Sequence, residues 1–232
     1  MNRSKLEILA YEDTPLGALC LRRRELLSQP GVFVTEVTLN HEFLMSSYNT
    51  DSERAISNRS IQMCGGDSLH ALVGGLGLGY TAHELICHPN VASVEVVEYL
   101  PSVVQWLRDG LIPLSKELNA AEQLRIVCGD IYDRLMNPPG ELFDLIVIDV
   151  DHSPSDQLGE EDHLFYTVDG LSKAKSHLRD GGVLAIWSYA ENSAFSEALR
   201  QVFDQVNVEP VQTVNDLVGH EQTDWLFFGT GL

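Results

Sequence analysis

The chain has 232 residues, of which 44% are hydrophobic, enough to bury the core of one domain with a small addition. It carries 34 acidic and 15 basic residues, a net charge of −19, which argues against nucleic acid as a partner because phosphate neutralisation needs clustered cations. Neither a signal-peptide pattern nor a run of about eighteen apolar residues occurs. We expect a cytoplasmic protein with no membrane partner and with four reduced, isolated cysteines.

Before residue 68 the chain reads as short strands separated by proline, glycine and polar turns. The strand-like segments are LEILAY, GALCLR and VFVTEVTL. We therefore predict a small N-terminal β-strand region over residues 1–68, followed by a single α/β domain over residues 69–232.

From residue 69 onward, short apolar runs alternate with amphipathic segments that have helical spacing. The predicted strands are HALVGG, SVEVVEY, LRIVCGD, FDLIVIDV and GGVLAIWS, with Arg179–Gly182 as the turn before the last of these. Predicted helices lie over LPSVVQWLRDGL, from Leu171 to Leu178, and over FSEALRQVF. Because runs such as LIVIDV are apolar on both faces, they suit a parallel sheet covered by helices. The predicted fold class is α/β, doubly wound and mostly parallel, closed by an antiparallel pair, VEPVQTVN and TDWLFFG.

The segment ALVGGLGLGYTAHEL, residues 71–85, passes from a predicted strand through four glycines into a predicted helix. Ligands of open parallel sheets bind at the carboxyl ends of the strands, where glycine lets the backbone approach them closely. Residues 77–82 also match the G-x-G-x-x-A pattern of dinucleotide-binding proteins. The glycines therefore leave two ligand classes open, NAD and a nucleoside without pyrophosphate.

Acidic residues end successive predicted strands, which favours the nucleoside. Glu98 is placed to accept hydrogen bonds from both ribose hydroxyls, Asp130 to meet the exocyclic amine of an adenine, and Asp149 and Asp151 follow the next strand. Carboxylates suit a cationic ligand such as a sulfonium nucleoside and repel pyrophosphate. The alternative interpretation of Asp130 is a helix N-cap, and that of the acidic stretch between Arg134 and Lys173 is a solvated loop.

One segment resembles a zinc motif. His83 to His88 nearly reproduces H-E-x-x-H, but its second histidine comes one position late and lies about 140° from the first around a helix. We predict no metal at this segment or elsewhere.

With these residues in place, the chain resembles the spermidine synthase family of polyamine aminopropyltransferases, which share the class I S-adenosylmethionine methyltransferase fold, a Rossmann-like seven-stranded sheet. The similarity covers most of residues 70–190 and includes CHPNVASVEVVEYL, FDLIVIDVDHSP and HLFYTVDGLSKAKSHLRDGGVLAIWS. Small bacterial spermidine synthase-like proteins are more similar still, in segments that look like Leu44 to Ser47, Gly74 to Thr81, Asp149 to Asp151 and Val183 to Ser188. The family also begins with a small β domain that leads into the substrate cleft.

The resemblance implies a role for each matching residue. The nucleoside would be bound by Gly75, Gly77, Gly79, Glu98, Tyr99, Asp130, Ile131 and Asp149. Asp149 and Asp151 would be the catalytic pair, with Asp149 taking the proton of the attacking amine. Substrate contacts would come from Asp151, His152 and Tyr166.

This sequence departs from the family's pattern at three places. Leu78 stands where the family has a donor-binding Asp, and Ser52-Glu53-Arg54 stands near the position of the Tyr-His-Glu of the amine site. His152 occupies the slot of the second Asp of the D-x-x-D element, for which Asp151 could compensate.

The implied reaction is transfer of an aminopropyl group from decarboxylated S-adenosylmethionine to a small cationic amine, with 5'-methylthioadenosine as product. The first alternative is methyl transfer from S-adenosylmethionine, which releases S-adenosylhomocysteine and is favoured by Leu78. The others are a non-catalytic nucleoside-binding protein and an NAD oxidoreductase, which needs a pyrophosphate site in a chain with few cations. We also expect a homodimer, since exposed strands of a β appendage often pair between subunits.

Overall fold

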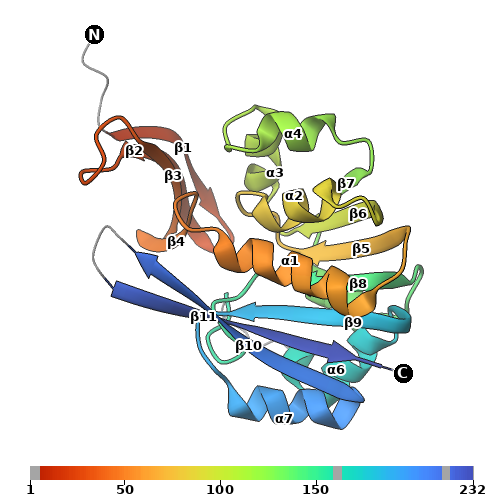
Figure 1. Ribbon diagram of the computed structural model, residues 1–232. Helices are drawn as coiled ribbons and strands as arrows, with labels where there is room; N and C mark the ends of the chain where they lie inside the picture. The colour runs from red at the N-terminus through yellow and green to blue at the C-terminus, as the bar shows by residue number, and fades with distance from the viewer. Residues whose placement is uncertain (1–5, 159–163, 216–219, 232) are drawn as a thin grey trace.

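The computed structural model describes residues 6–158, 164–215 and 220–231, and it contains two sheets. The first is a four-stranded antiparallel sheet whose strands pair in chain order. It consists of β1 (Leu6–Thr14), β2 (Gly17–Glu25), β3 (Phe33–Leu39) and β4 (Glu42–Ser46). Figure 1 shows it, in red and orange, standing beside the larger part of the molecule. The predicted N-terminal strands are therefore present.

The second sheet has seven strands in the order β10-β11-β9-β8-β5-β6-β7. Its strands are β5 (Leu69–Gly74), β6 (Val91–Glu98), β7 (Leu124–Cys128), β8 (Phe143–Ile148), β9 (Leu178–Ser188), β10 (Gln205–Asn215) and β11 (His220–Thr230). Strands β5 to β9 pair in parallel, whereas β11 pairs antiparallel with both β9 and β10. This confirms the predicted mostly parallel sheet and its closing antiparallel pair.

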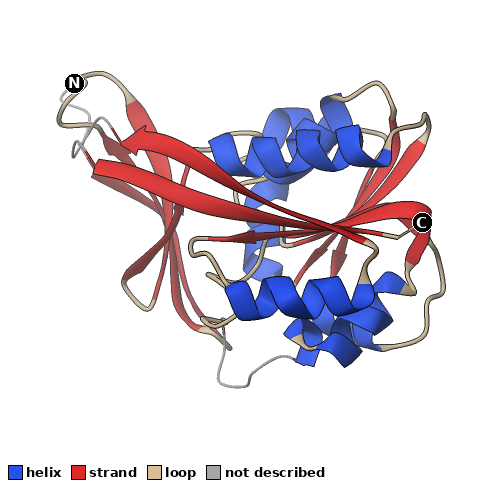
Figure 2. Ribbon diagram, turned by 60° about the horizontal axis from the view of Figure 1, so that its bottom comes forward, coloured by secondary structure: helices blue, strands red, loops and turns tan. Residues whose placement is uncertain are grey.

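Helices cover both faces of this sheet (Figure 2). They are α1 (Asp51–Cys64), α2 (Tyr80–Cys87), α3 (Pro101–Arg108), α4 (Ser115–Ala120), α5 (Ile131–Met136), the short 3-10 helix η1 (Leu164–Tyr166), α6 (Val168–Lys175) and α7 (Ser193–Val202). Apolar residues of α1 to α4 fill one core, and those of α5, η1, α6 and α7 fill the other. In the described part of the chain, no helix has the length and apolar character needed to span a membrane.

Helix α1 lies within the N-terminal region for which the sequence predicted only strands. Its buried face contains Ser52, Ser57 and Ser60 beside Ile56 and Ile61, so its apolar periodicity is weak. The hydroxyls of Ser57 and Ser60 donate to the carbonyls of Glu53 and Ile56, which satisfies them inside the core. Helix α1 packs on α2 and β9 of the larger sheet, while the domain boundary at residue 68 stays a prediction.

Strand β9 differs from the prediction at its start. It begins at Leu178 and runs through the predicted turn at Arg179–Gly182. The pairing with β8 jumps from Phe143–Leu178 to Leu145–Val183, so the extra residues form a bulge. Gly181 lies there at φ +74°, a conformation that favours glycine.

Candidate active site

The glycine loop lies at the carboxyl end of β5 and enters α2. Gly75, Gly77 and Gly79 all have positive φ, at +91°, +50° and +87°. A Cβ at Gly75 would lie 2.4 Å from the carbonyl oxygen of Asp149, and one at Gly77 would lie 2.8 Å from Sδ of Met45. The glycines therefore allow the loop to pack closely against the end of β8 and against strand β4, and they keep the space beside it open.

A large cavity of about 940 Å³ opens at the carboxyl ends of the parallel strands, between the glycine loop and the N-terminal sheet. Nearly all the residues predicted to bind a nucleoside line it, namely Gly75, Gly77, Glu98, Tyr99, Asp130, Ile131 and Asp149. Gly79 instead lines a second, smaller cavity and packs against Leu118. The N-terminal sheet adds apolar residues such as Val37 and Met45 to the large cavity.

Glu98 ends β6 and is buried between backbone amides. Its Oε2 accepts the N–H of Leu76 and its Oε1 that of Leu100, both at 2.8 Å. Burial raises the pKa of Glu98, and the backbone hydrogen bonds oppose that shift. Because each carboxylate oxygen can accept more than one hydrogen bond, the side chain can hold two ribose hydroxyls while keeping these bonds.

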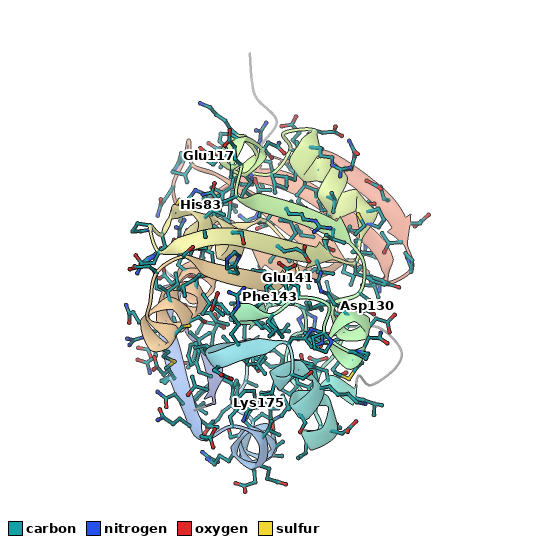
Figure 3. All side chains as sticks on the ribbon, turned by 90° about the vertical axis from the view of Figure 1, so that its right-hand side faces the viewer. His83, Glu117, Asp130, Glu141, Phe143 and Lys175 are labelled. Carbon is teal, nitrogen blue, oxygen red and sulfur yellow. The ribbon has the colours of Figure 1, made fainter. Side chains whose placement is uncertain are left out.

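Asp130 is the N-cap of α5, at whose start it is labelled in Figure 3. Its Oδ1 accepts the backbone N–H groups of Tyr132 at 2.8 Å and Asp133 at 3.4 Å. Asp130 is thus the helix N-cap of the alternative interpretation that was drawn from the sequence, and it also lines the large cavity. Both hydrogen bonds use the same oxygen, so capping does not preclude a contact through Oδ2.

Asp149 follows β8 and borders both cavities. Its Oδ2 accepts a hydrogen bond of 2.7 Å from the hydroxyl of Thr81. Burial raises the pKa of Asp149 to about 6, the Thr81 hydrogen bond opposes the shift, and the charge of Asp224 adds to it. A carboxylate with this pKa is ionised at neutral pH and can accept a proton from a substrate.

The small cavity, of about 230 Å³, adjoins the large one through Gly75, Gly77 and Asp149. Two of the carboxylates that line it have protein partners, Glu36 with Arg24 and Asp151 with its hydrogen-bond donors. The three others come from distant parts of the chain: Glu53 of α1, Asp149 and Asp224 of β11. Burial, and next the charge of Asp149, raise the pKa of Glu53 to about 8. Burial also raises the pKa of Asp224, opposed by hydrogen bonds from Ser52 and Gln222. With this pKa, Glu53 is mostly protonated at neutral pH in the free protein, and a positively charged ligand bound beside it would favour its ionised form.

Sequence reasoning did not identify two of these three carboxylates as site residues. Glu53 was noted only for its position near the family's amine site, and Asp224 was not singled out. The available signal for Asp224 was a charge inside the apolar strand TDWLFFG, where it is only 2% exposed. A carboxylate in a buried strand carries a large desolvation cost, which often marks a functional site.

The predicted substrate-binding residues lie in different surroundings. His152 lines both cavities, and Asp151 lines the small one. Asp151 is only 3% exposed, and its carboxylate accepts hydrogen bonds from the hydroxyls of Tyr132 and Tyr166 and from the N–H of Leu158. Asp151 therefore already has protein donors, and the hydroxyl of Tyr166 is directed to it. Substrate contact by Asp151 and Tyr166 stays a prediction.

The zinc-like segment lies away from this site. In Figure 3, His83 is on the opposite side of the view from Asp130. The ring of His83 approaches Sγ of Cys87, with 3.6 Å from Nε2 to sulfur. Among the residues that the structure describes, no three His, Cys, Asp or Glu side chains are grouped to hold a metal ion. All four cysteines are free thiols.

The strand order, the glycine loop after the first parallel strand and the acid ending the next strand define a class I methyltransferase-like fold with a large cavity at the carboxyl ends of its strands. The small N-terminal sheet beside that site is an addition to the fold.

Comparisons with known proteins narrow the class. No protein-family model matches the chain. Polyamine aminopropyltransferase 2 of Streptomyces coelicolor is 31% identical over 88 residues, which are 37% of this chain and only 16% of that protein's length. Spermidine synthase from Thermotoga maritima superimposes with a TM-score of 0.73 at 15% identity, covering 96% of this chain and 72% of the other. A spermidine synthase in complex with the transition state analogue AdoDATO gives 0.75 at 17% identity, over 96% and 73% of the two chains. The chain is therefore spermidine synthase-like in fold.

Proposed function

We propose that the protein is a transferase that moves an aminopropyl group from decarboxylated S-adenosylmethionine to a small amine. The large cavity would hold the nucleoside, with Glu98 at the ribose and Asp130, Tyr99 and Ile131 around the adenine. The small cavity would hold the acceptor amine, next to Asp149. Structural similarity to a spermidine synthase bound to AdoDATO supports this assignment.

The charges that line the two cavities carry the proposal. Glu53, Asp149 and Asp224 meet in the small cavity, and the one Lys or Arg among the described lining residues is Arg24, which is paired with Glu36 at 2.6 Å. The α-carboxylate of S-adenosylmethionine would find no free cationic side chain there. The decarboxylated donor lacks that carboxylate and keeps the ammonium that both donors carry, which the acids attract. They can thus compensate for Leu78, and aminopropyl transfer is favoured over methyl transfer.

The site residues must bind an ammonium and then remove a proton from it. An alkylamine with a pKa near 10 is about one part in a thousand neutral at pH 7, which costs about 4 kcal/mol. In the reaction a nitrogen–carbon bond forms, the carbon–sulfur bond of the sulfonium breaks, and the thioether nucleoside leaves. Asp149, which borders both cavities, is placed to take the amine's proton, while Glu53 and Asp224 hold the acceptor. Alignment of the two substrates supplies most of the rate enhancement.

Incubation of the protein with each donor and a set of small amines tests the proposal. We expect 5'-methylthioadenosine from the decarboxylated donor and no S-adenosylhomocysteine from S-adenosylmethionine. The opposite result would establish methyl transfer, and nucleoside binding without either product would indicate a non-catalytic binding protein.

A substitution separates the two halves of the site. Glu53→Gln should raise the acceptor's KM at least tenfold and leave the affinity for 5'-methylthioadenosine within about twofold, because Glu53 lines only the small cavity. Glu117→Gln is the matched control, since Glu117 is exposed on α4 at the top of Figure 3. Equal effects of the two substitutions on KM would contradict the assignment of the acceptor site.

The cytoplasmic location and the homodimer expected from the sequence belong to this proposal as well. Analytical ultracentrifugation of the purified chain measures the second of these, and a monomer at micromolar concentration would remove it from the proposal.

A further inference from the structure

One buried carboxylate is held by neutral donors from three segments of the chain. Oδ2 of Asp151 accepts the hydroxyls of Tyr132 at 2.5 Å and Tyr166 at 2.8 Å, and Oδ1 accepts the N–H of Leu158 at 2.7 Å. The two hydroxyl oxygens lie 3.0 Å apart. Because a buried charge is strongly destabilising without such donors, this group has one well-defined arrangement.

The two tyrosines are fixed in their role as donors. Burial raises the pKa of both hydroxyls well above 10, and the charge of Asp151 acts in the same direction. Their rings pack in an aromatic cluster, with Phe165 centred 5.1 Å from Tyr132 and 5.0 Å from Tyr166. Neither ring can turn away without disturbing the core that η1 and α5 share.

The segments that meet at Asp151 carry the two halves of the candidate active site. Asp149 lies two residues before Asp151, and residues 156–158 form part of the wall of the large cavity. Tyr132 follows directly after Asp130 and Ile131, which line the same cavity from α5. The hydrogen bonds of Asp151 thus join the wall that carries Asp149 to the helix that faces the nucleoside.

We infer that Asp151 is a positioning residue. Its hydrogen bonds with Tyr132 and Tyr166 hold Asp149 and the segment up to Leu158 in a fixed position relative to the nucleoside-binding end of α5. This inference rests on the proposed function and replaces the expected substrate contact of Asp151. Alignment of the reacting groups dominates such a reaction, so a displacement of Asp149 by about 1 Å would lower kcat up to a hundredfold.

Tyr166→Phe tests the inference because it removes one hydroxyl and keeps the ring. We expect kcat to fall at least tenfold, the acidic limb of the kcat profile to shift as Asp149 moves, and the affinity for 5'-methylthioadenosine to change less than threefold. Tyr189→Phe is the control, since that exposed hydroxyl donates to Asp156 of the same segment at 3.1 Å and lines neither cavity. A purely structural hydroxyl would lower the melting temperature and leave kcat and its pH profile unchanged, which would overturn the inference.

A second measurement does not depend on turnover. Amide hydrogen exchange of residues 150–158, without any substrate, should accelerate at least tenfold in Tyr166→Phe and stay unchanged in Tyr189→Phe. Unchanged exchange in both variants overturns the inference even if aminopropyl transfer is demonstrated. If no transfer is found but exchange is accelerated in Tyr166→Phe, the proposed function is wrong, and Asp151 with its tyrosine donors still holds residues 150–158 in place.

Discussion

Asp149→Asn should inactivate the protein and at the same time stabilise it. The pKa of Asp149 is raised from 3.8 to about 6 by burial, so its charge opposes folding. Below pH 3.8 the group is protonated in the folded and unfolded chains and the penalty is absent; it develops as the pH rises towards 6 and is complete above that value. A shift of about two pKa units corresponds to about 3 kcal/mol. The amide is neutral at every pH and can still accept the Thr81 hydroxyl through its oxygen.

Urea denaturation of both proteins between pH 4.5 and pH 8 measures this effect. We expect the variant to be more stable by about 2–3 kcal/mol at pH 8 and by much less at pH 4.5, with turnover reduced at least a thousandfold at pH 8. A gain independent of pH would show that packing, not charge, distinguishes the two side chains. A variant that kept full turnover would refute the role of Asp149 as proton acceptor.

Three further predictions concern the same site. Glu98→Gln should weaken the binding of 5'-methylthioadenosine at least tenfold, because an amide N–H would face the backbone N–H of Leu76 or Leu100. Calorimetry measures this affinity, and an unchanged value would rule out Glu98 as the ribose ligand. Gly75→Ala should lower kcat at least a hundredfold by displacing Asp149, whereas Gly140→Ala, with open space around its Cβ, should leave kcat unchanged. Equal kcat values for the two variants would contradict the close packing of Gly75 against Asp149. The ratio kcat/KM, which reports the free enzyme, should be lost as the pH falls through about 6, since protonated Asp149 accepts no proton. A flat kcat/KM profile from pH 5 to pH 8 would exclude this base.

The larger sheet could be predicted because its strands are recognised locally. Segments such as LIVIDV and VLAIWS are apolar on both faces, and the pair at the end of the chain has no helix between its strands. Helix α1 could not be predicted this way, because it buries serine hydroxyls that bond to its own carbonyls. The bulge at Gly181 was mistaken for a turn since both need glycine at positive φ.

The residues predicted to bind a nucleoside could be grouped from the sequence for a geometric reason. Gly75, Glu98 and Asp130 each lie at the end of a strand or just after it, and parallel strands bring their carboxyl ends to one edge of the sheet. Glu53 and Asp224 come from α1 and β11, which meet only through tertiary packing, so no local pattern joins them. The hydrogen bonds of Tyr132 and Tyr166 to Asp151 could not be predicted either, because they too join segments that meet only through tertiary packing.

The small cavity takes Glu53 and Asp224 from either side of residues 74–131, the stretch that supplies the predicted nucleoside residues other than Asp149. Under the proposed function, substitutions in α1 and β11 can therefore change which amine is accepted, while Glu98 and Asp130, which line only the large cavity, keep the donor's binding place intact. Under the same proposal, related sequences can differ in the amine that they accept and keep the same donor-binding residues.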